Sequence, residues 1–182
     1  MVNIYKLKLT SLQQDILRLL SIKAGKSLNQ RQIANFLEVS QPAIMKSLPE
    51  LMKEDLIKMQ QDKETKRWSI SLNRDNHKVI QLKRADNLKL VYEAGFVDFL
   101  EKEFAGATII LFGSYSRGDD MANSDIDIAV IGRKEKKVDL AKYEKAFERV
   151  ININFYNSFK NIHKYLKENL CNGIVLVGGV EL

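Results

Sequence analysis

The sequence predicts an α+β protein of two domains: helices with a β-hairpin, followed by a small mixed-sheet α/β domain. Over residues 1–74, apolar residues recur first at helical and then at alternating spacing, whereas residues 105–182 alternate short apolar strands with helices. Charge divides near the same place. Residues 1–72 hold 12 Lys and Arg against 7 Asp and Glu, and residues 73–182 hold 17 against 16. Almost all of the net charge of +6 thus lies in the first domain, as expected of a polyanion-binding unit or a solvated basic surface.

The first domain begins with three predicted helices. Apolar residues spaced three and four apart predict a helix from Ser11. Asn29 is placed to cap a short helix over 30–37 and Ser40 to cap a third helix, because both side chains accept hydrogen bonds from first-turn N–H groups. Pro49 falls inside the third helix and is expected to kink or shorten it.

Two strands follow, "LIKM" and "RWSISL", with the polar segment "QQDKETKR" between them as the tip of a hairpin. Helix, helix-turn-helix and hairpin over residues 9–72 resemble the winged helix-turn-helix family of DNA-binding domains. The resemblance implies that the third helix enters the major groove and that the hairpin, the wing, touches the DNA backbone. Many domains of this pattern serve protein contacts instead, so that alternative stays open. The residues implied to contact DNA are Gln41, Lys46, Lys63, Lys66 and Arg67.

Residues 75–104 form a predicted connector that is helical almost throughout, because strong helix formers alternate with regularly spaced apolar residues. Gly95 is expected to divide it into two helices. The apolar content predicts that the connector packs against the second domain, and a homodimer interface there stays open.

The second domain contains the segment "LFGSYSRGDDMANSDIDIAV". Alternation in its second strand puts Ile126 and Ile128 on one face and Asp125 and Asp127 on the other. Two carboxylates about 7 Å apart along a strand can chelate hard cations. Mg²⁺ is the expected cation, because it uses one or two carboxylates and takes its other ligands from water and phosphates.

Gly113 and Ser114 precede the aspartates. Gly113 permits a sharp turn close to a ligand, and Ser114 offers a hydroxyl and an amide. The pattern Gly-Ser, ten residues, Asp-Ile-Asp resembles the minimal nucleotidyltransferases of the DNA polymerase β superfamily, over residues 105–180. The resemblance implies that Gly113 and Ser114 hold the phosphates of an NTP, with ATP expected. It also implies that Asp125 and Asp127 are catalytic Mg²⁺ ligands and that Arg117 offsets phosphate charge.

The superfamily places a third carboxylate on a later strand, which here is "RVININFY". Alternation turns Asn152, Asn154 and Tyr156 toward the aspartates. An amide is a weaker Mg²⁺ ligand than a carboxylate and cannot act as a general base. Glu148, at the entrance of the strand, is the remaining acidic candidate.

Two functions stay open at this level. The first is a DNA-binding transcriptional regulator whose second domain binds Mg-NTP with reduced or no catalysis. The second is an active Mg-dependent nucleotidyltransferase that transfers NMP to a hydroxyl of a protein, an RNA or a small molecule. The resemblance further implies that a helical protein partner, as in toxin–antitoxin pairs, would accompany the second function.

The composition excludes several other classes. Apolar runs such as "TIILF" are far shorter than the roughly 18 residues that span a bilayer, and "MVNIYKLKLTS" lacks the apolar region of a signal peptide. A cytoplasmic protein without membrane contact is therefore expected. Cys171 is the single cysteine, and His77 and His163 lie far from it, which argues against a disulfide or a Cys/His zinc site.

Overall fold

The computed structural model describes residues 9–63 and 66–180 of the chain. These residues form two compact units that divide between Val79 and Ile80, within the first turn of helix α4 (His77–Glu93), which is described with the second unit. Among the described helices, none is long and apolar enough to cross a membrane.

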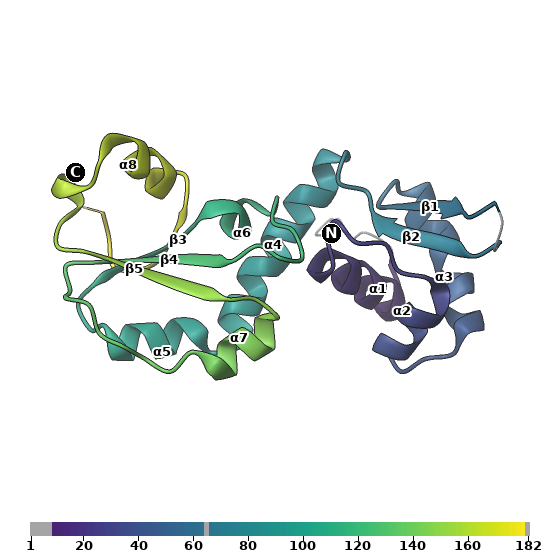
Figure 1. Ribbon diagram of the computed structural model, residues 1–182, viewed down its shortest axis with the longest axis horizontal. Helices are drawn as coiled ribbons and strands as arrows, with labels where there is room; N and C mark the ends of the chain where they lie inside the picture. Colours follow the sequence, from purple (N-terminus) through teal and green to yellow (C-terminus); the bar gives the residue numbers. More distant parts are fainter. Residues whose placement is uncertain (1–8, 64–65, 181–182) are drawn as a thin grey trace, which may run out of the picture. The chain divides into compact units, whose positions relative to one another are not determined.

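The first unit consists of three helices and an antiparallel hairpin, the element order of a winged helix (Figure 1). Leu28, which precedes α2, also bridges to Ile70 in the centre of β2. The elements are α1 (Ser11–Ile22), α2 (Gln30–Phe36), α3 (Gln41–Lys53), β1 (Ile57–Gln61) and β2 (Trp68–Leu72).

Both predicted caps of the helix-turn-helix are confirmed. The side chain of Asn29 accepts a hydrogen bond from the N–H of Gln32 at 2.9 Å, and that of Ser40 accepts one from the N–H of Ala43 at 3.4 Å. Each cap satisfies a first-turn donor and so fixes where the helix begins.

The expected shortening of α3 at Pro49 is wrong, because the helix continues through this residue to Lys53. Pro49 is exposed, whereas Ile44, Leu48 and Leu51 are almost wholly buried on the other side of α3. Burial of a large aliphatic side chain contributes about 1.5–3 kcal/mol. Three such side chains together offset the roughly 3 kcal/mol that an interior proline costs.

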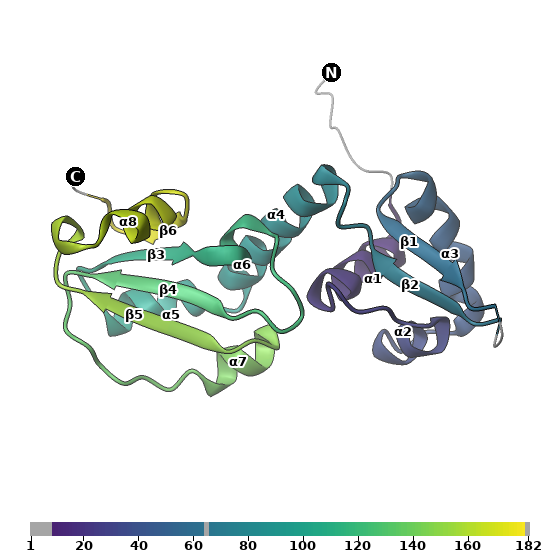
Figure 2. The same cartoon turned by 45° about the horizontal axis from the view of Figure 1, so that its top comes forward.

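The second unit is a four-stranded mixed sheet, as predicted, and helices lie on both of its faces. Its strand order is β5-β4-β3-β6, in which β4 and β5 are parallel and the other pairs antiparallel (Figure 2). The elements are α4 (His77–Glu93), α5 (Phe96–Glu103), β3 (Thr108–Phe112), α6 (Gly113–Arg117), β4 (Ile126–Ile131), α7 (Ala141–Phe147), β5 (Ile151–Tyr156), a 3-10 turn (Phe159–Asn161), α8 (Lys164–Cys171) and β6 (Ile174–Val177).

Two layers of apolar side chains enclose the sheet. On one face, Ile128 of β4 packs with Phe96 of α5 and Phe147 of α7. On the other face, Ala129 belongs to a smaller cluster that includes Leu170 of α8. Figure 1 shows α5 and α7 on one side of the sheet and α8 on the other.

The connector is divided at Gly95, as predicted. Gly95 has φ +68°, a left-handed conformation that glycine adopts without strain. Helix α4 ends at Glu93 and α5 begins at Phe96, which is fully buried in the core of the second unit.

Candidate functional site

The two predicted aspartates lie at the start of the central strand β4. Asp125 directly precedes the strand, and Asp127 is in register with Asn152 of β5. Aligned residues of neighbouring strands share a face, so Asp127 and Asn152 point to the side opposite the buried Ile126 and Ile128. The alternation predicted for this strand is therefore confirmed.

Gly113 brings the Gly-Ser turn into contact with Asp127. It begins α6 directly after β3 and has φ +76°. A Cβ atom at this position would lie 2.5 Å from Oδ2 of Asp127, closer than any side-chain carbon can approach. The backbone conformation and the nearby carboxylate thus both require glycine here.

Of the two asparagines predicted to face the aspartates, Asn152 is the one that lies beside them. Its Nδ2 donates a hydrogen bond to Oδ2 of Asp125 at 3.1 Å. Asn154 and Tyr156 follow on the same face but are in register with Ala129 and Ile131, farther along β4. We call Gly113, Asp125, Asp127 and Asn152 the aspartate site.

Glu148 lies three residues before β5. It is the exposed C-cap of α7, with φ +52°, and its carbonyl accepts a hydrogen bond from Arg149 at 3.0 Å.

The electrostatics of the aspartate site favour a cation. Burial raises the pKa of Asp127, the amide of Asn152 lowers it by hydrogen bonding, and the negative charge of Asp125 raises it again. Burial also raises the pKa of Tyr156, and the charge of Asp127 adds to that rise. A cation between the two carboxylates would relieve the repulsion that raises the pKa of Asp127.

The donor atoms of the aspartate site fit a hard cation that keeps part of its hydration shell. Two carboxylates and one amide supply oxygen ligands, which suit Mg²⁺. No group of three or more His, Cys, Asp or Glu residues that could hold a metal ion occurs within residues 9–63 and 66–180. A cation at the aspartate site would therefore take its remaining ligands from water or from a bound phosphate.

Ser114 and Arg117 both belong to the short helix α6. Ser114 is half-buried beside Gly113, at the start of the helix. Arg117 is exposed at its end, where Nε donates to Oδ2 of Asp119 at 3.2 Å. The structure therefore places the Arg117 guanidinium against a neighbouring carboxylate.

A second candidate surface lies in the first unit, between the N-termini of α2 and α3 and the segment of the wing that leads into β2. It is a groove of about 480 Å³, which we call the basic groove. Gln30 fixes one wall by donating from Nε2 to the carbonyl of Gln41 at 2.8 Å. The lining residues are Asn29, Gln30, Arg31, Gln41, Lys66, Arg67 and Trp68.

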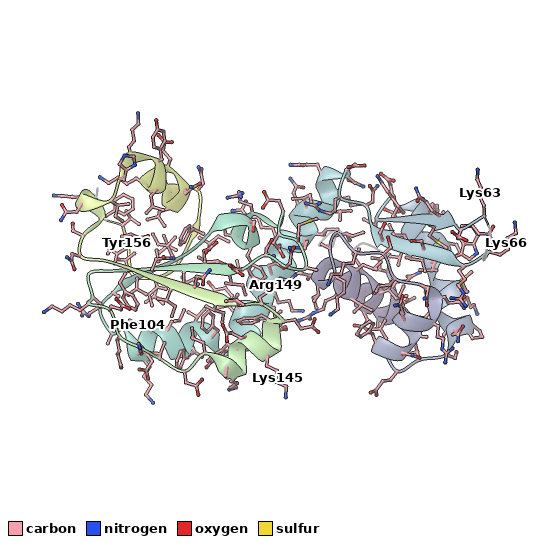
Figure 3. All side chains as sticks on the ribbon, in the orientation of Figure 1. Lys63, Lys66, Phe104, Lys145, Arg149 and Tyr156 are labelled. Carbon is pink, nitrogen blue, oxygen red and sulfur yellow. The ribbon has the colours of Figure 1, made fainter. Side chains whose placement is uncertain are left out.

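The basic groove brings together three of the five predicted DNA contacts, namely Gln41, Lys66 and Arg67. Lys46 is exposed on α3 but does not line the groove, and Lys63 is exposed near the end of the hairpin. Figure 3 shows Lys63 and Lys66 together at that end of the first unit, with their side chains directed outward.

Sequence reasoning missed Arg31, which adds a third cation to the groove. The available signal was its position two residues after Asn29, the cap of α2. The first turn of a helix presents free N–H groups, so a basic residue there would reinforce an anion-binding surface.

Residues 94–177 match the family described as "Nucleotidyltransferase domain". The match includes β3, α6, β4 and β5, and therefore the whole aspartate site. The second unit thus carries a nucleotidyltransferase domain. No curated protein matches the chain.

The solved structures that resemble this chain include regulators of the MarR type. The zinc-responsive MarR family member ZitR of Lactococcus lactis is 24% identical, with a TM-score of 0.42, over 56% of this chain and 67% of that one. The adhesin competence repressor AdcR of Streptococcus pyogenes is 23% identical, with a TM-score of 0.43, over 57% and 72%. MepR of S. aureus in complex with DNA is 23% identical, with a TM-score of 0.38, over 52% and 81%.

Proposed function

We propose that this protein is a DNA-binding transcriptional regulator whose nucleotidyltransferase domain binds Mg-NTP, with ATP the expected nucleotide, and catalyses transfer slowly or not at all. The observation that carries the proposal is the make-up of the aspartate site. Two carboxylates and the Gly-Ser turn are in place, while an amide occupies the third position.

In the proposed complex, different residues bind the nucleotide phosphates and the Mg²⁺ ion. Gly113 and Ser114 would hold the phosphates through backbone N–H groups and the Ser114 hydroxyl. Asp125 and Asp127 would hold Mg²⁺, which when bound neutralises charge on the phosphate oxygens. Arg117 would add a long-range positive charge, reduced by its pairing with Asp119.

Slow catalysis follows from the lack of a base at the third position. A hydroxyl that attacks a phosphorus atom must lose its proton, and the Asn152 amide cannot accept it. Tyr156 is protonated at neutral pH, because burial and the charge of Asp127 raise its pKa above the ordinary value of 10.0. Neither side chain can therefore replace the missing carboxylate.

DNA binding is supported by the basic groove. Gln41 lies exposed in the first turn of α3, from which a side chain can reach base edges. Arg31, Lys66 and Arg67 lie around it, where they would neutralise phosphates. The net charge of +5 in residues 1–72 supports the same role.

Calorimetric titration of the full chain with ATP, with Mg²⁺ and with EDTA, tests the proposal when wild type is compared with Asp125→Asn. We expect binding that requires both Mg²⁺ and Asp125. Wild type that binds ATP equally well in EDTA, or not at all, would contradict the proposal. A shift assay with DNA from the protein's own promoter tests the other half, since binding should be selective and should weaken steeply with salt.

Active transfer is the second candidate, and the contact between Gly113 and Asp127 supports it, because the residues proposed to hold phosphate and metal lie next to each other. An acceptor that brings its own base would complete the chemistry. Incubation of a cell extract with α-phosphate-labelled NTP distinguishes the two functions. Label that appears on a protein or RNA with wild type but not with Asp125→Asn would establish the transferase.

A further inference from the structure

One carboxylate of the nucleotidyltransferase domain outside the aspartate site, Asp120, lies buried in an ion cluster. Asp120 is 1% exposed, and two cations accompany it: Lys83 of α4, 2% exposed, and Arg149 of the turn before β5, 6% exposed. Lys83 Nζ contacts Oδ1 of Asp120 and donates to its backbone carbonyl at 3.1 Å. Arg149 Nη2 lies 3.5 Å from Oδ2.

Asn87 extends this cluster along the same face of α4, one turn beyond Lys83. Its Nδ2 donates to Oδ1 of Asp120 at 2.9 Å and to the carbonyl of Tyr115, in α6, at 3.0 Å. One amide thus joins α6 to the loop that follows it. We call Lys83, Asn87, Asp120 and Arg149 the Asp120 cluster.

Gly118 presses the same loop onto α4. It has φ +79°, and a Cβ atom here would lie 2.4 Å from the carbonyl oxygen of Ile80 and 2.7 Å from the amide nitrogen of Arg84. The segment between Gly113 and Asp125 is therefore fixed to α4 at its middle, by backbone contact as well as by charge.

Each chain segment that supplies the aspartate site is tied to the Asp120 cluster. Helix α6, which contains Gly113, is held through the carbonyl of Tyr115. The loop that leads to Asp125 is held at Asp120. Strand β5 is held by Arg149, three residues before Asn152.

Stability alone is a poor explanation of this arrangement. Removing charges from water is costly, and well-packed apolar residues often stabilise a fold as well as a buried ion pair does. Hydrogen bonds to a buried carboxylate fix direction and distance, which apolar contacts do not. The Asp120 cluster is thus suited to fixing geometry.

We propose that Lys83, Asn87 and Asp120 are positioning residues that set the separation between the Gly113–Ser114 turn and the Asp125–Asp127 pair. A correct separation lets one Mg²⁺ touch both the aspartates and a nucleotide phosphate, so metal and nucleotide strengthen each other's binding. The inference rests on the proposed binding of Mg-NTP.

The measurable quantity is the coupling between metal and nucleotide. It is the ratio of the ATP dissociation constant in EDTA to that in saturating Mg²⁺, obtained by calorimetry on the full chain. Lys83→Met leaves Asp120 and Arg149 as a neutral pair, and Asn87→Leu changes no charge. In both variants we expect the coupling ratio to fall on the order of tenfold, the range seen when partners of metal ligands are removed.

Controls separate positioning from folding. Lys89→Met removes an exposed Lys on the same helix, paired with Glu93 at 3.5 Å, and should leave the ratio unchanged. Circular dichroism melts define a temperature at which each variant is folded, and there a merely stabilising role would leave the ratio at its wild-type value. An unchanged ratio in folded Asn87→Leu overturns the inference and leaves the proposed function intact. A wild-type ratio near one overturns both.

Discussion

The two units use their basic residues in opposite ways. In the first unit, Arg31, Lys66 and Arg67 are exposed around a groove, whereas in the second unit Lys83 and Arg149 are buried around one carboxylate. Exposed cations can exchange water for phosphate at small cost, and salt screens them. Buried cations stay paired with their carboxylate, so they fix the positions of the chain segments that carry them. Changes at the aspartate site, whose chain segments these buried cations hold, should therefore have large effects, and changes at the basic groove should have small, additive ones.

The largest effect is expected at Gly113, because the aspartate site leaves no space for a side chain at this position. Gly113→Ala would place a Cβ against Asp127, so Mg²⁺-dependent ATP binding should weaken on the order of 100-fold. Gly132→Ala is the matched control, because Gly132 has φ +86° but a Cβ atom there would meet nothing within 4 Å. Calorimetry of both variants checks the prediction. Equal losses would mean that backbone strain, and not the carboxylate contact, explains the glycine.

Asn152→Asp tests whether the third carboxylate is all that the aspartate site lacks for catalysis. With a base beside Asp125, transfer of labelled NMP should accelerate on the order of 100-fold, the usual contribution of general base catalysis. Asn154→Asp adds the same charge on the same strand face but opposite Ala129, and should give no gain. The rate is measured with radiolabelled NTP in cell extract. A gain in neither variant would show that more than the base is missing.

Single substitutions in the basic groove should each reduce DNA affinity by a small amount. Arg31→Gln and Arg67→Gln should each weaken DNA binding and lower the slope of log affinity against log salt by about one. The double variant should lose the sum of the two. Fluorescence anisotropy at several salt concentrations measures both quantities. Lys58→Gln, in β1 and paired with Asp75, is the control and should change neither. A loss of DNA affinity in the double variant that exceeds the sum of the single losses would contradict the expected additivity. It would mean that the cations of the basic groove bind DNA cooperatively.

The smallest effect concerns stability without metal. Burial and Asp125 raise the pKa of Asp127 in the folded state, so this state loses stability as pH rises through that raised pKa. Asp127→Asn removes the charge, and at pH 7 in EDTA it should raise the melting temperature of the second unit by about 1–2 °C. Calorimetric scans at neutral and at acidic pH check the sign, because the difference should shrink once wild-type Asp127 is protonated. A lower melting temperature at pH 7 would contradict it.

Much of the fold was predictable because it follows from local patterns. Asn29 and Ser40 cap helices, Gly95 divides the connector, and the alternation around Asp127 sets which side chains share a face. Each of these signals acts within a few residues. Pro49 was misjudged because burial of the opposite side of α3 outweighs a local penalty.

The site was predictable only in part. Gly113, Asp125, Asp127 and Asn152 come together as the strand pattern implied. Asp120 gave no signal, since in sequence it is one of two adjacent loop acids. Its burial depends on contacts with residues of α4, more than 30 positions earlier in the chain. Arg31 was missed because its place in the first turn of α2 is a weak signal by itself, and the groove that it lines also needs Lys66 and Arg67 from a later part of the chain.

The hydrogen bond between Asn152 and Asp125 also has an evolutionary consequence. With an amide at the third position, the aspartate site has two negative charges in the absence of a metal. One of them, on Asp125, accepts a hydrogen bond from the amide of Asn152. Codons for Asn and Asp differ at one base, so a single point mutation at residue 152 would separate the proposed nucleotide-binding protein from a potential enzyme. The scaffold around Gly113 would stay the same in both. If the proposed function is correct, a lineage could therefore gain or lose transferase activity here without rebuilding the fold, and the first unit would stay unchanged.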